Sequence, residues 1–549
     1  MTDLDTTMLV IGDEPHYFFD NGMIEVAHDV TRTIHSPRKM DANPLIQRDR
    51  PWEHITYFTY NGWHVWRDPP TRRFHCLYTD WKIDTERVAR EGGSIIDWNN
   101  ARLRQLYAYS DDGLEWCKPP MGIQREEGQD TNIVFGLEDY GSAYDFCVID
   151  DPLETDPARR YKSLYVTIPR GSSLEELRPG ALIHAGYSAD AIHWTPFERP
   201  PTFGKLGSHL SDVLITTYDP ATKTYLNFTR HPWQGGGPLS EAHLAGDPRG
   251  PIGGTPGFDR VVSRANRRNK RRIFLSESRD FINWSEPRII LAPDPHLDNI
   301  DDAFYGMSPY RLGGEWVGFV NVFHMVSNTI DSELLHSRDG RHWTRIAPGK
   351  PWLQVGPPGA WDQFMVNMTS PPIVNGNELM VYFGGAKNHH DWWFAGHTES
   401  KQNPEGWKDV PEVWDLDSRG YHLGLASMRV DGFVSIGANR LREGLIVTQP
   451  FVTAGDRLTI NAACRTGGYI KVEVLDAAGS VLPGRGAADC DVFTGDSIAH
   501  EVAWKGERSV PRPDRGPALT PQSYRRLRFT LRDAEIYSFR VHSAPKAAG

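Results

Sequence analysis

A seven-residue pattern, Ser-x-Asp-x-x-x-Trp, recurs along the N-terminal part of the chain and limits its fold more than any other feature. Each copy follows an apolar, strand-like run and precedes a stretch that contains proline: Ser110-Asp112-Trp116, Ser188-Asp190-Trp194, Ser278-Asp280-Trp284 and Ser337-Asp339-Trp343. The Asp can accept hydrogen bonds from the backbone N–H groups of a tight turn, and the Trp can cover the neighbouring strand. Each copy therefore predicts a strand, a turn and a second strand of a repeating β unit.

A second kind of turn precedes these copies. Residues 68–74, 156–161 and 219–225 each combine Asp-Pro with a following aromatic residue, between two strand-like runs. Proline sets φ for a turn, and the aromatic residue opens the next strand. The two turns together divide each unit into four consecutive strands, which is the blade of a β-propeller.

The number of inner strands sets the predicted architecture. They begin near Ile55, Phe146, Val213, Phe304 and Met365. An all-β fold follows, with a five-bladed β-propeller over residues 41–430. From residue 431 to residue 549, short alternating strands with Gly, Pro and Asp turns predict a C-terminal β-sandwich. Residues 1–40 form an N-terminal segment that either packs on the sandwich or closes the propeller.

Composition excludes several classes of protein. The net charge is -11 and the acidic residues are interspersed, which argues against a nucleic-acid surface. The one basic run, residues 264–272, is interpreted as a solvated loop. The sequence shows no apolar run that could span a membrane, no export signal and no close cysteine pairs, so we expect a cytoplasmic protein without metal or cofactor.

Acidic residues stand at or just before every predicted inner strand. They are Glu53, Asp145, Asp212, Asp302 (next to Asp301) and Asp362. Inner strands of a propeller surround one axis, so these side chains are expected to meet in a shared funnel. Each acid alone could simply cap a turn. A ring of repelling carboxylates suits glycoside cleavage, because one acid must keep its proton while another must be ionised.

This architecture resembles the five-bladed propeller glycosidases of glycoside hydrolase families 43, 32 and 68, over roughly residues 40–430. The resemblance implies a nucleophile or base, an orienting Asp and a general acid from the first three blades, which match Glu53, Asp145 and Asp212. The Asn-Asp-Pro-Asn and Glu-Cys signatures of those families are absent. Asp302 and Asp362 are therefore further candidates for the catalytic pair. The segment Arg67-Asp68-Pro69 imitates another family signature but occupies one of the repeated turns.

Aromatic, imidazole and charged side chains near the strand starts are candidates for sugar binding by ring stacking and hydrogen bonds. They are Trp52, Tyr144, His209, Arg230, His231, Tyr305, Trp361, His389, His390 and Asp391. The alternatives for the His389-His390-Asp391 loop are a surface loop or a metal site.

The predicted activity is hydrolysis of an oligosaccharide or glycoside, with a furanoside containing fructose or arabinose implied by the family resemblance. A propeller phosphorylase and a noncatalytic glycan-binding propeller are the alternatives; Arg230 and His231 are the only group that suggests a phosphate pocket. The Ser-x-Asp turn also resembles the Asp-box of six-bladed sialidases, but the inner strand starts here are acidic, not basic. A homo-oligomer is compatible with the sequence.

Overall fold

Almost all regular structure in the chain is β-strand, as the sequence predicts. The computed structural model describes residues 9–59, 62–84, 86–87, 90, 101–136, 142–168, 181–230, 271–299, 301–390, 392, 404–414, 419–513 and 520–544. The short helices are α5 (Pro404–Trp407), α6 (Pro411–Trp414) and the 3-10 turns Pro157–Arg159, Gly204–Leu206 and Pro521–Ser523. In the part of the chain described above, no helix is long and apolar enough to cross a bilayer.

Three separate sheets follow one another in the chain; their strands pair antiparallel, except for the parallel pair β18 and β23 in the third sheet. The first unit contains β6 (Thr56–Tyr57), β7 (Trp63–Arg67), β8 (Phe74–Ile83), β9 (Ala101–Ser110) and β12 (Ile133–Phe135). The second contains β13 (Ser142–Tyr144), β14 (Ile149–Asp150), β15 (Tyr161–Ile168), β16 (Ala181–Ser188), β17 (Thr195–Pro196) and β19 (His209–Leu210). The third contains β18 (Thr202–Phe203), β20 (Ile215–Asp219), β21 (Thr224–Thr229), β22 (Ile273–Ser278), β23 (Asn283–Trp284) and β24 (Arg288–Leu291). A small hairpin, β10 (Arg125–Glu126) and β11 (Gln129–Asp130), lies within the first unit's connection.

Two further units share one nine-stranded sheet. The fourth unit contains β25 (Asp302–Leu312), β26 (Glu315–His324), β27 (Thr329–Ser337) and β28 (Thr344–Arg345). The fifth contains β29 (Met365–Asn367), β30 (Ile373–Asn375), β31 (Glu378–Ala386) and β32 (Tyr421–Arg429), and its outer edge is β5 (Arg38–Lys39) from the N-terminal segment. The two units are joined by one parallel pairing, Ile330 with Met365.

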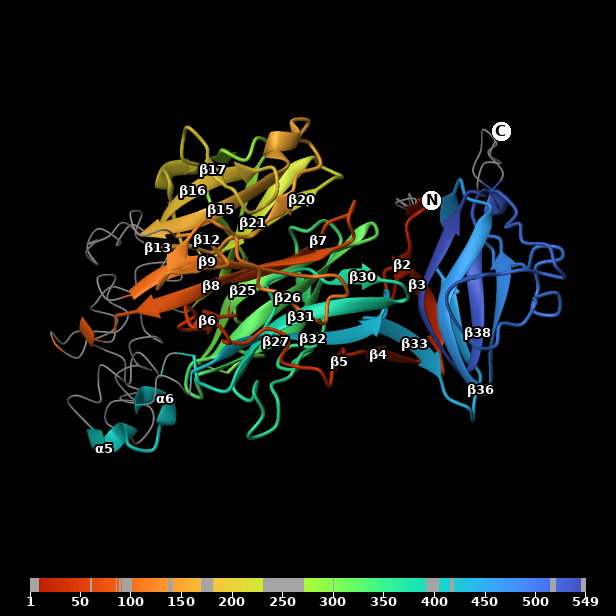
Figure 1. Cartoon of the computed structure of the whole chain (residues 1–549). Helices are drawn as coiled ribbons and strands as arrows, with labels where there is room; N and C mark the ends of the chain where they lie inside the picture. The colour runs from red at the N-terminus through yellow and green to blue at the C-terminus, as the bar shows by residue number, and fades with distance from the viewer. Residues whose placement is uncertain are drawn as a thin grey trace.

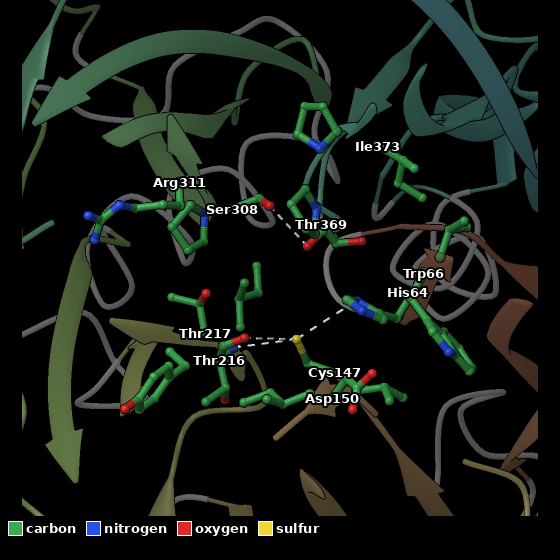
Figure 2. Close-up of a pocket in the computed structure, with 18 of the residues that line it drawn as sticks. His64, Trp66, Cys147, Asp150, Thr216, Thr217, Ser308, Arg311, Thr369 and Ile373 are labelled. Carbon is green, nitrogen blue, oxygen red and sulfur yellow. Dashed lines mark hydrogen bonds between the residues drawn. The ribbon is translucent and has the colours of Figure 1, made fainter. Parts of the chain in front are cut away.

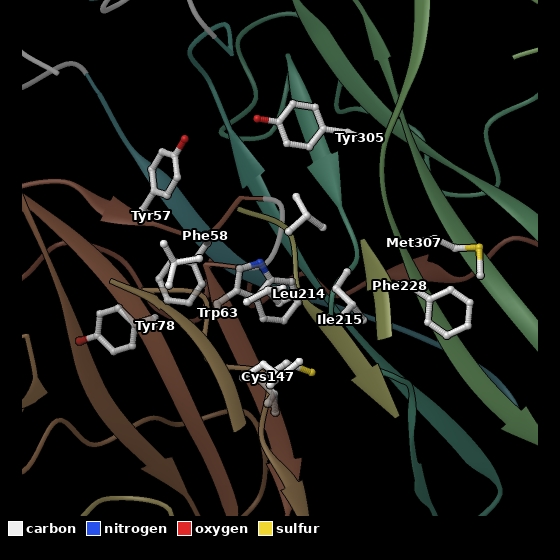
Figure 3. Packing of buried hydrophobic residues seen from close by; sticks show 14 of the residues in the cluster. Tyr57, Phe58, Trp63, Tyr78, Cys147, Leu214, Ile215, Phe228, Tyr305 and Met307 are labelled. Carbon is white, nitrogen blue, oxygen red and sulfur yellow. The ribbon is translucent and has the colours of Figure 1, made fainter. Parts of the chain in front are cut away.

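Successive units contact one another, and the fifth contacts the first. Strand β9 contacts β13, β14 contacts β20, β20 contacts β25, and β32 contacts β6. The Thr56 hydroxyl donates to the carbonyl of Tyr421 at 2.9 Å. Between the two ends of the inner strands, Trp63, Leu214 and Met307 belong to one packed apolar cluster (Figure 3). Side chains of the first, third and fourth units therefore pack into one core.

The Ser-x-Asp turns have the structure that their sequence predicts. In the last copy, the N–H groups of Arg341 and His342 both donate to Asp339 Oδ1 at 2.8 Å. Gly340 has a φ of +71°, and the Trp343 indole donates to its carbonyl at 3.0 Å. The Trp343 ring packs against Gly318 of β26, where a Cβ would lie 2.7 Å from it. These contacts make the repeat a structural feature.

The Asp-Pro turns follow the inner strands, at the ends opposite to the strand starts. Asp68 accepts a hydrogen bond from the Thr71 hydroxyl at 2.6 Å and one from Arg160 of the second unit at 2.8 Å. Asp219 accepts one from Arg311 of the fourth unit at 3.1 Å. These contacts connect neighbouring units, and they explain Asp68 without any catalytic role.

The C-terminal part forms an eight-stranded sheet with a core of its own, seen on the right in Figure 1. Its strands are β2 (His16–Tyr17), β3 (Ile24–His28), β4 (Thr31–Ile34), β33 (Val434–Ala438), β34 (Gly444–Thr448), β36 (Arg457–Leu475), β37 (Asp496–Glu501) and β38 (Arg526–His542). Next to it, β1 (Leu9–Ile11) pairs in parallel with β35 (Phe451–Thr453). In the N-terminal segment, β2, β3 and β4 pair with strands of this sheet, and β5 pairs with β32 of the fifth unit.

Candidate functional site

Side chains from the third and fourth units meet where the inner strands begin. Asp212, just before β20, forms an ion pair with Arg230, just after β21. The Arg230 guanidinium lies 4.4 Å from the ring centre of Tyr305 on β25, and the Arg271 guanidinium lies 4.2 Å from the same ring. The Ser211 hydroxyl also donates to Asp212, at 3.0 Å.

His390, after β31, brings the fifth unit into this group. Its ring centre lies 4.7 Å from that of Tyr305 and 4.7 Å from that of Phe323, with steep interplanar angles. Phe323 also lies under Arg271, at 5.1 Å. We call this group the Arg271 cluster; it consists of Asp212, Arg230, Arg271, Tyr305, Phe323 and His390. The sequence analysis named four of them as candidates: Asp212, Arg230, Tyr305 and His390.

The charge state of Asp212 follows from its neighbours. Burial would raise the pKa of Asp212, but Arg230, Arg271 and the Ser211 hydroxyl outweigh burial and hold the pKa below its ordinary value of 3.8. A general acid must instead hold a proton near neutral pH. In this state, Asp212 is suited to act as an ionised carboxylate.

Asp302 belongs to a second group beside the cluster. Its carboxylate contacts His324 Nδ1 at 2.6 Å, and His324 Nε2 lies 3.1 Å from Asp331. Burial would raise the pKa of Asp302, but His324 and the backbone N–H of Asn299 lower it below its ordinary value. Burial would lower the pKa of His324, but hydrogen bonds to Asp302 and Asp331 raise it to about 10. His324 is therefore a cation between two carboxylates.

This arrangement predicts a pH-dependent contribution to stability. The folded pKa of His324, about 10, lies above its ordinary value of 6.5, so the contribution is fully present below pH 6.5 and is lost as the pH rises toward 10. We expect His324→Gln to lower the free energy of unfolding more at about pH 6 than at about pH 9. Urea titrations of both proteins at the two pH values measure the difference. An equal loss at both would contradict the assigned charge.

Glu53 is enclosed by hydrogen-bond donors in the first unit. Its carboxylate accepts from the Tyr78 hydroxyl at 2.6 Å and from Lys118 Nζ at 2.8 and 2.9 Å. The backbone N–H groups of Asp49 and Arg50 donate to its second oxygen at 2.9 and 3.1 Å. The Glu53 side chain has no exposed surface. These contacts favour a role in holding the turn before β6, and its role as nucleophile stays a prediction.

The remaining predicted acids lie in different surroundings. Asp145 is completely buried, and its φ of +67° is in the left-handed region. Asp362 forms an ion pair with Lys39 of β5, the outermost strand of the fifth unit. Trp361 stacks on Phe383 with ring centres 5.6 Å apart. Asp362 and Trp361 are therefore directed along the fifth unit, toward its outer strand.

The other predicted binding residues do not belong to the Arg271 cluster. Trp52 donates from its indole to Asn132 at 2.8 Å, in the first unit. His389 pairs with Glu412 of α6 and stacks between Phe364 and Trp392. His209 is half-buried in β19. His231, Asp391 and the side chain of Tyr144 lie outside the described residues.

Sequence reasoning missed part of the cluster. Arg271 belongs to the basic run that was interpreted as a solvated loop; that interpretation is wrong for Arg271, which packs on two aromatic rings. Phe323 and His324 are the last residues of β26. Only their pairing with the start of β25 connects them with the site, and no local pattern in the sequence indicates that pairing. Within the described ranges, no group of three or more His, Cys, Asp or Glu side chains is arranged to hold a metal ion.

A cavity of about 680 Å³ lies at the other end of the axis (Figure 2). Each unit contributes to its lining, for example His64, Cys147, Thr216, Ser308 and Thr369. Cys147 Sγ lies 3.9 Å from His64 Nδ1, and burial lowers the pKa of His64 to about 4 and raises that of Cys147 to about 11. None of the five predicted acids is among its described lining residues.

Solved structures of carbohydrate-active proteins resemble the chain weakly. An N-acetylgalactosamine deacetylase from F. plautii, in complex with blood group B trisaccharide, is 14% identical, with a TM-score of 0.39 over 72% of this chain and 95% of that chain. A β-1,2-mannobiose phosphorylase from Listeria innocua is 11% identical, with a TM-score of 0.41 over 73% and 97%. A structure from work on the GH130 family of mannoside phosphorylases and hydrolases is 13% identical, with a TM-score of 0.40 over 72% and 94%.

No family model matches the sequence. No curated protein matches it either. The structural likenesses are too weak to assign a function.

Proposed function

We propose that the chain is an enzyme that cleaves a glycosidic bond at the Arg271 cluster. The observation that carries the proposal is the meeting of Asp212 with Arg230, Tyr305 and His390, side chains that come from three different units. An ionised carboxylate beside aromatic and basic groups suits a sugar-cleaving site.

The fold we propose around this cluster is a five-bladed β-propeller over residues 41–430, with a C-terminal β-sandwich over residues 431–549. Contacts between successive units, and between β32 and β6, support closure of the ring. The separate apolar core of the C-terminal sheet supports the second domain.

Within this site, we propose that Asp212 acts in its ionised form, either attacking the anomeric carbon or activating water. Asp145, at the equivalent position of the second unit, is the second carboxylate of the proposed pair. The proposed substrate class is an oligosaccharide that contains a furanoside of fructose or arabinose. Phosphorolysis is the second candidate, because Arg230 and Arg271 lie against one ring beside Asp212.

The test is turnover of aryl arabinofuranosides, fructofuranosides and pyranosides by the purified full-length chain, with and without inorganic phosphate. We expect release of the aryl group without phosphate, with a bell-shaped pH profile. Turnover that requires phosphate would replace hydrolysis by phosphorolysis. Binding of glycans without turnover of any substrate would refute the enzyme and leave a glycan-binding propeller.

A further inference from the structure

Arg271 has an unusual combination of contacts. Its guanidinium lies against Tyr305 at 4.2 Å and Phe323 at 5.1 Å, and its carbonyl accepts from the Phe304 N–H at 3.0 Å. Its Nε is buried and has no hydrogen-bond partner among the described residues. The side chain as a whole is half-buried, so part of it remains accessible. The aromatic faces hold the plane of the guanidinium, but among the described residues they leave its buried Nε–H without an acceptor.

Arg271 has no hydrogen bond or ion pair to a carboxylate among the residues that the structure describes. Asp212 is the carboxylate of the cluster, and it is bonded to Arg230. Arg271 acts on Asp212 only through space, as one of the charges that lower the pKa of that carboxyl. Asp302, nearby on β25, is bonded to His324 instead. Arg271 therefore lies near the charge of Asp212 without a bond to it, and a partly buried cation is stabilised by a counter-ion.

A guanidinium that is held flat, with an Nε–H that has no acceptor among the described residues, is suited to an oxyanion. Its parallel N–H groups match the two oxygens of a carboxylate or of a phosphate. Arg230, on the same aromatic ring, adds a second positive charge beside this position. We propose that Arg271, supported by Arg230, binds an oxyanion next to Asp212: the carboxylate of a uronic acid in the substrate, or a phosphate group. This inference rests on the proposed function, because it describes what the same site recognises.

The test measures binding separately from catalysis. Isothermal titration of the full chain uses inorganic phosphate, glucuronate and galacturonate as probes, with glucose and galactose as their neutral counterparts. We expect at least one oxyanion to bind and the neutral sugars to bind much more weakly. Phosphate binding without uronate binding assigns the site to phosphate, and the reverse result assigns it to a carboxylate on the sugar.

Three variants locate the binding. Arg271→Gln should weaken oxyanion binding by about tenfold or more, which corresponds to about 1.4 kcal/mol. Arg271→Lys should recover part of it, because an ammonium keeps the charge without the planar fork. Arg279→Gln is the matched control, since Arg279 is an exposed arginine in the turn of the same unit. Circular dichroism and thermal unfolding verify that each variant is folded.

The outcomes separate this inference from the proposed function. No oxyanion binding by the unmodified chain, or unchanged binding in folded Arg271→Gln, overturns the inference even if neutral glycosides are cleaved. Oxyanion binding that is lost in Arg271→Gln supports it, even if no glycoside is cleaved and the proposed function fails.

Discussion

Replacing Asp212 by Asn is expected to lower kcat on the best glycoside substrate by about a thousandfold, because the amide can neither attack the anomeric carbon nor activate water. KM should change much less, since Arg230, Tyr305 and His390 remain to bind the sugar. The amide is nearly the same size as the carboxylate and can still accept a hydrogen bond from Arg230, so the fold should be retained. Steady-state kinetics on folded protein measure both constants.

Asp362→Asn is the matched control for this variant. Asp362 occupies the equivalent position in the fifth unit, but it is bonded to Lys39 of the outer strand. Its turnover per folded molecule should equal that of the unmodified chain. Asp212→Asn with unmodified turnover would remove the Arg271 cluster as the site of catalysis.

The pH profile offers an independent check on Asp212. Arg230 and Arg271 hold the pKa of Asp212 below 3.8 despite its burial. A group with a lowered pKa stays ionised throughout the neutral and mildly acidic range, so Asp212 should produce no acidic limb in kcat/KM within that range. An acidic limb near pH 6 in the unmodified chain would assign the ionised role to another carboxylate.

The sequence predicted the parts of this protein that depend on local chemistry. The Ser-x-Asp turn needs one Asp, one residue with positive φ and one Trp within seven positions, and the hydrogen bonds that hold it form inside that segment. Four of the five predicted inner strands could be located for the same reason, because each of them follows such a turn along the chain, whereas the first inner strand precedes the first copy. Asp212, Arg230 and Tyr305 were found through their positions at those strand ends.

The partners that decide what each acid does could not be predicted. Lys118 is separated from Glu53 by 65 residues, and Lys39 from Asp362 by 323 residues. Each pair depends on the packing of strands across a sheet, which leaves no local pattern in the sequence. An acid with a basic partner and an acid facing a substrate therefore look identical before the fold is known.

Glu53 is an acid with a basic partner, and its replacement should affect stability. We expect Glu53→Gln to lower the free energy of unfolding by about 3 kcal/mol or more, because it leaves the buried ammonium of Lys118 without its buried counter-ion. Removing a charge from a solvent-exposed pair would cost much less. Urea unfolding of the full chain, monitored by tryptophan fluorescence, measures the change.

The double variant Glu53→Gln/Lys118→Met separates structure from catalysis. It removes both charges together, so it should recover part of the stability lost in Glu53→Gln, whereas two independent effects would add. If Glu53 only holds the turn before β6, the folded fraction of Glu53→Gln retains its turnover. If Glu53 is the nucleophile, turnover per folded molecule is lost in both variants, whatever the change in stability. Replacing Glu53 is thus expected to lower stability, and replacing Asp212 is expected to lower the rate, although the sequence places both carboxylates at equivalent strand starts.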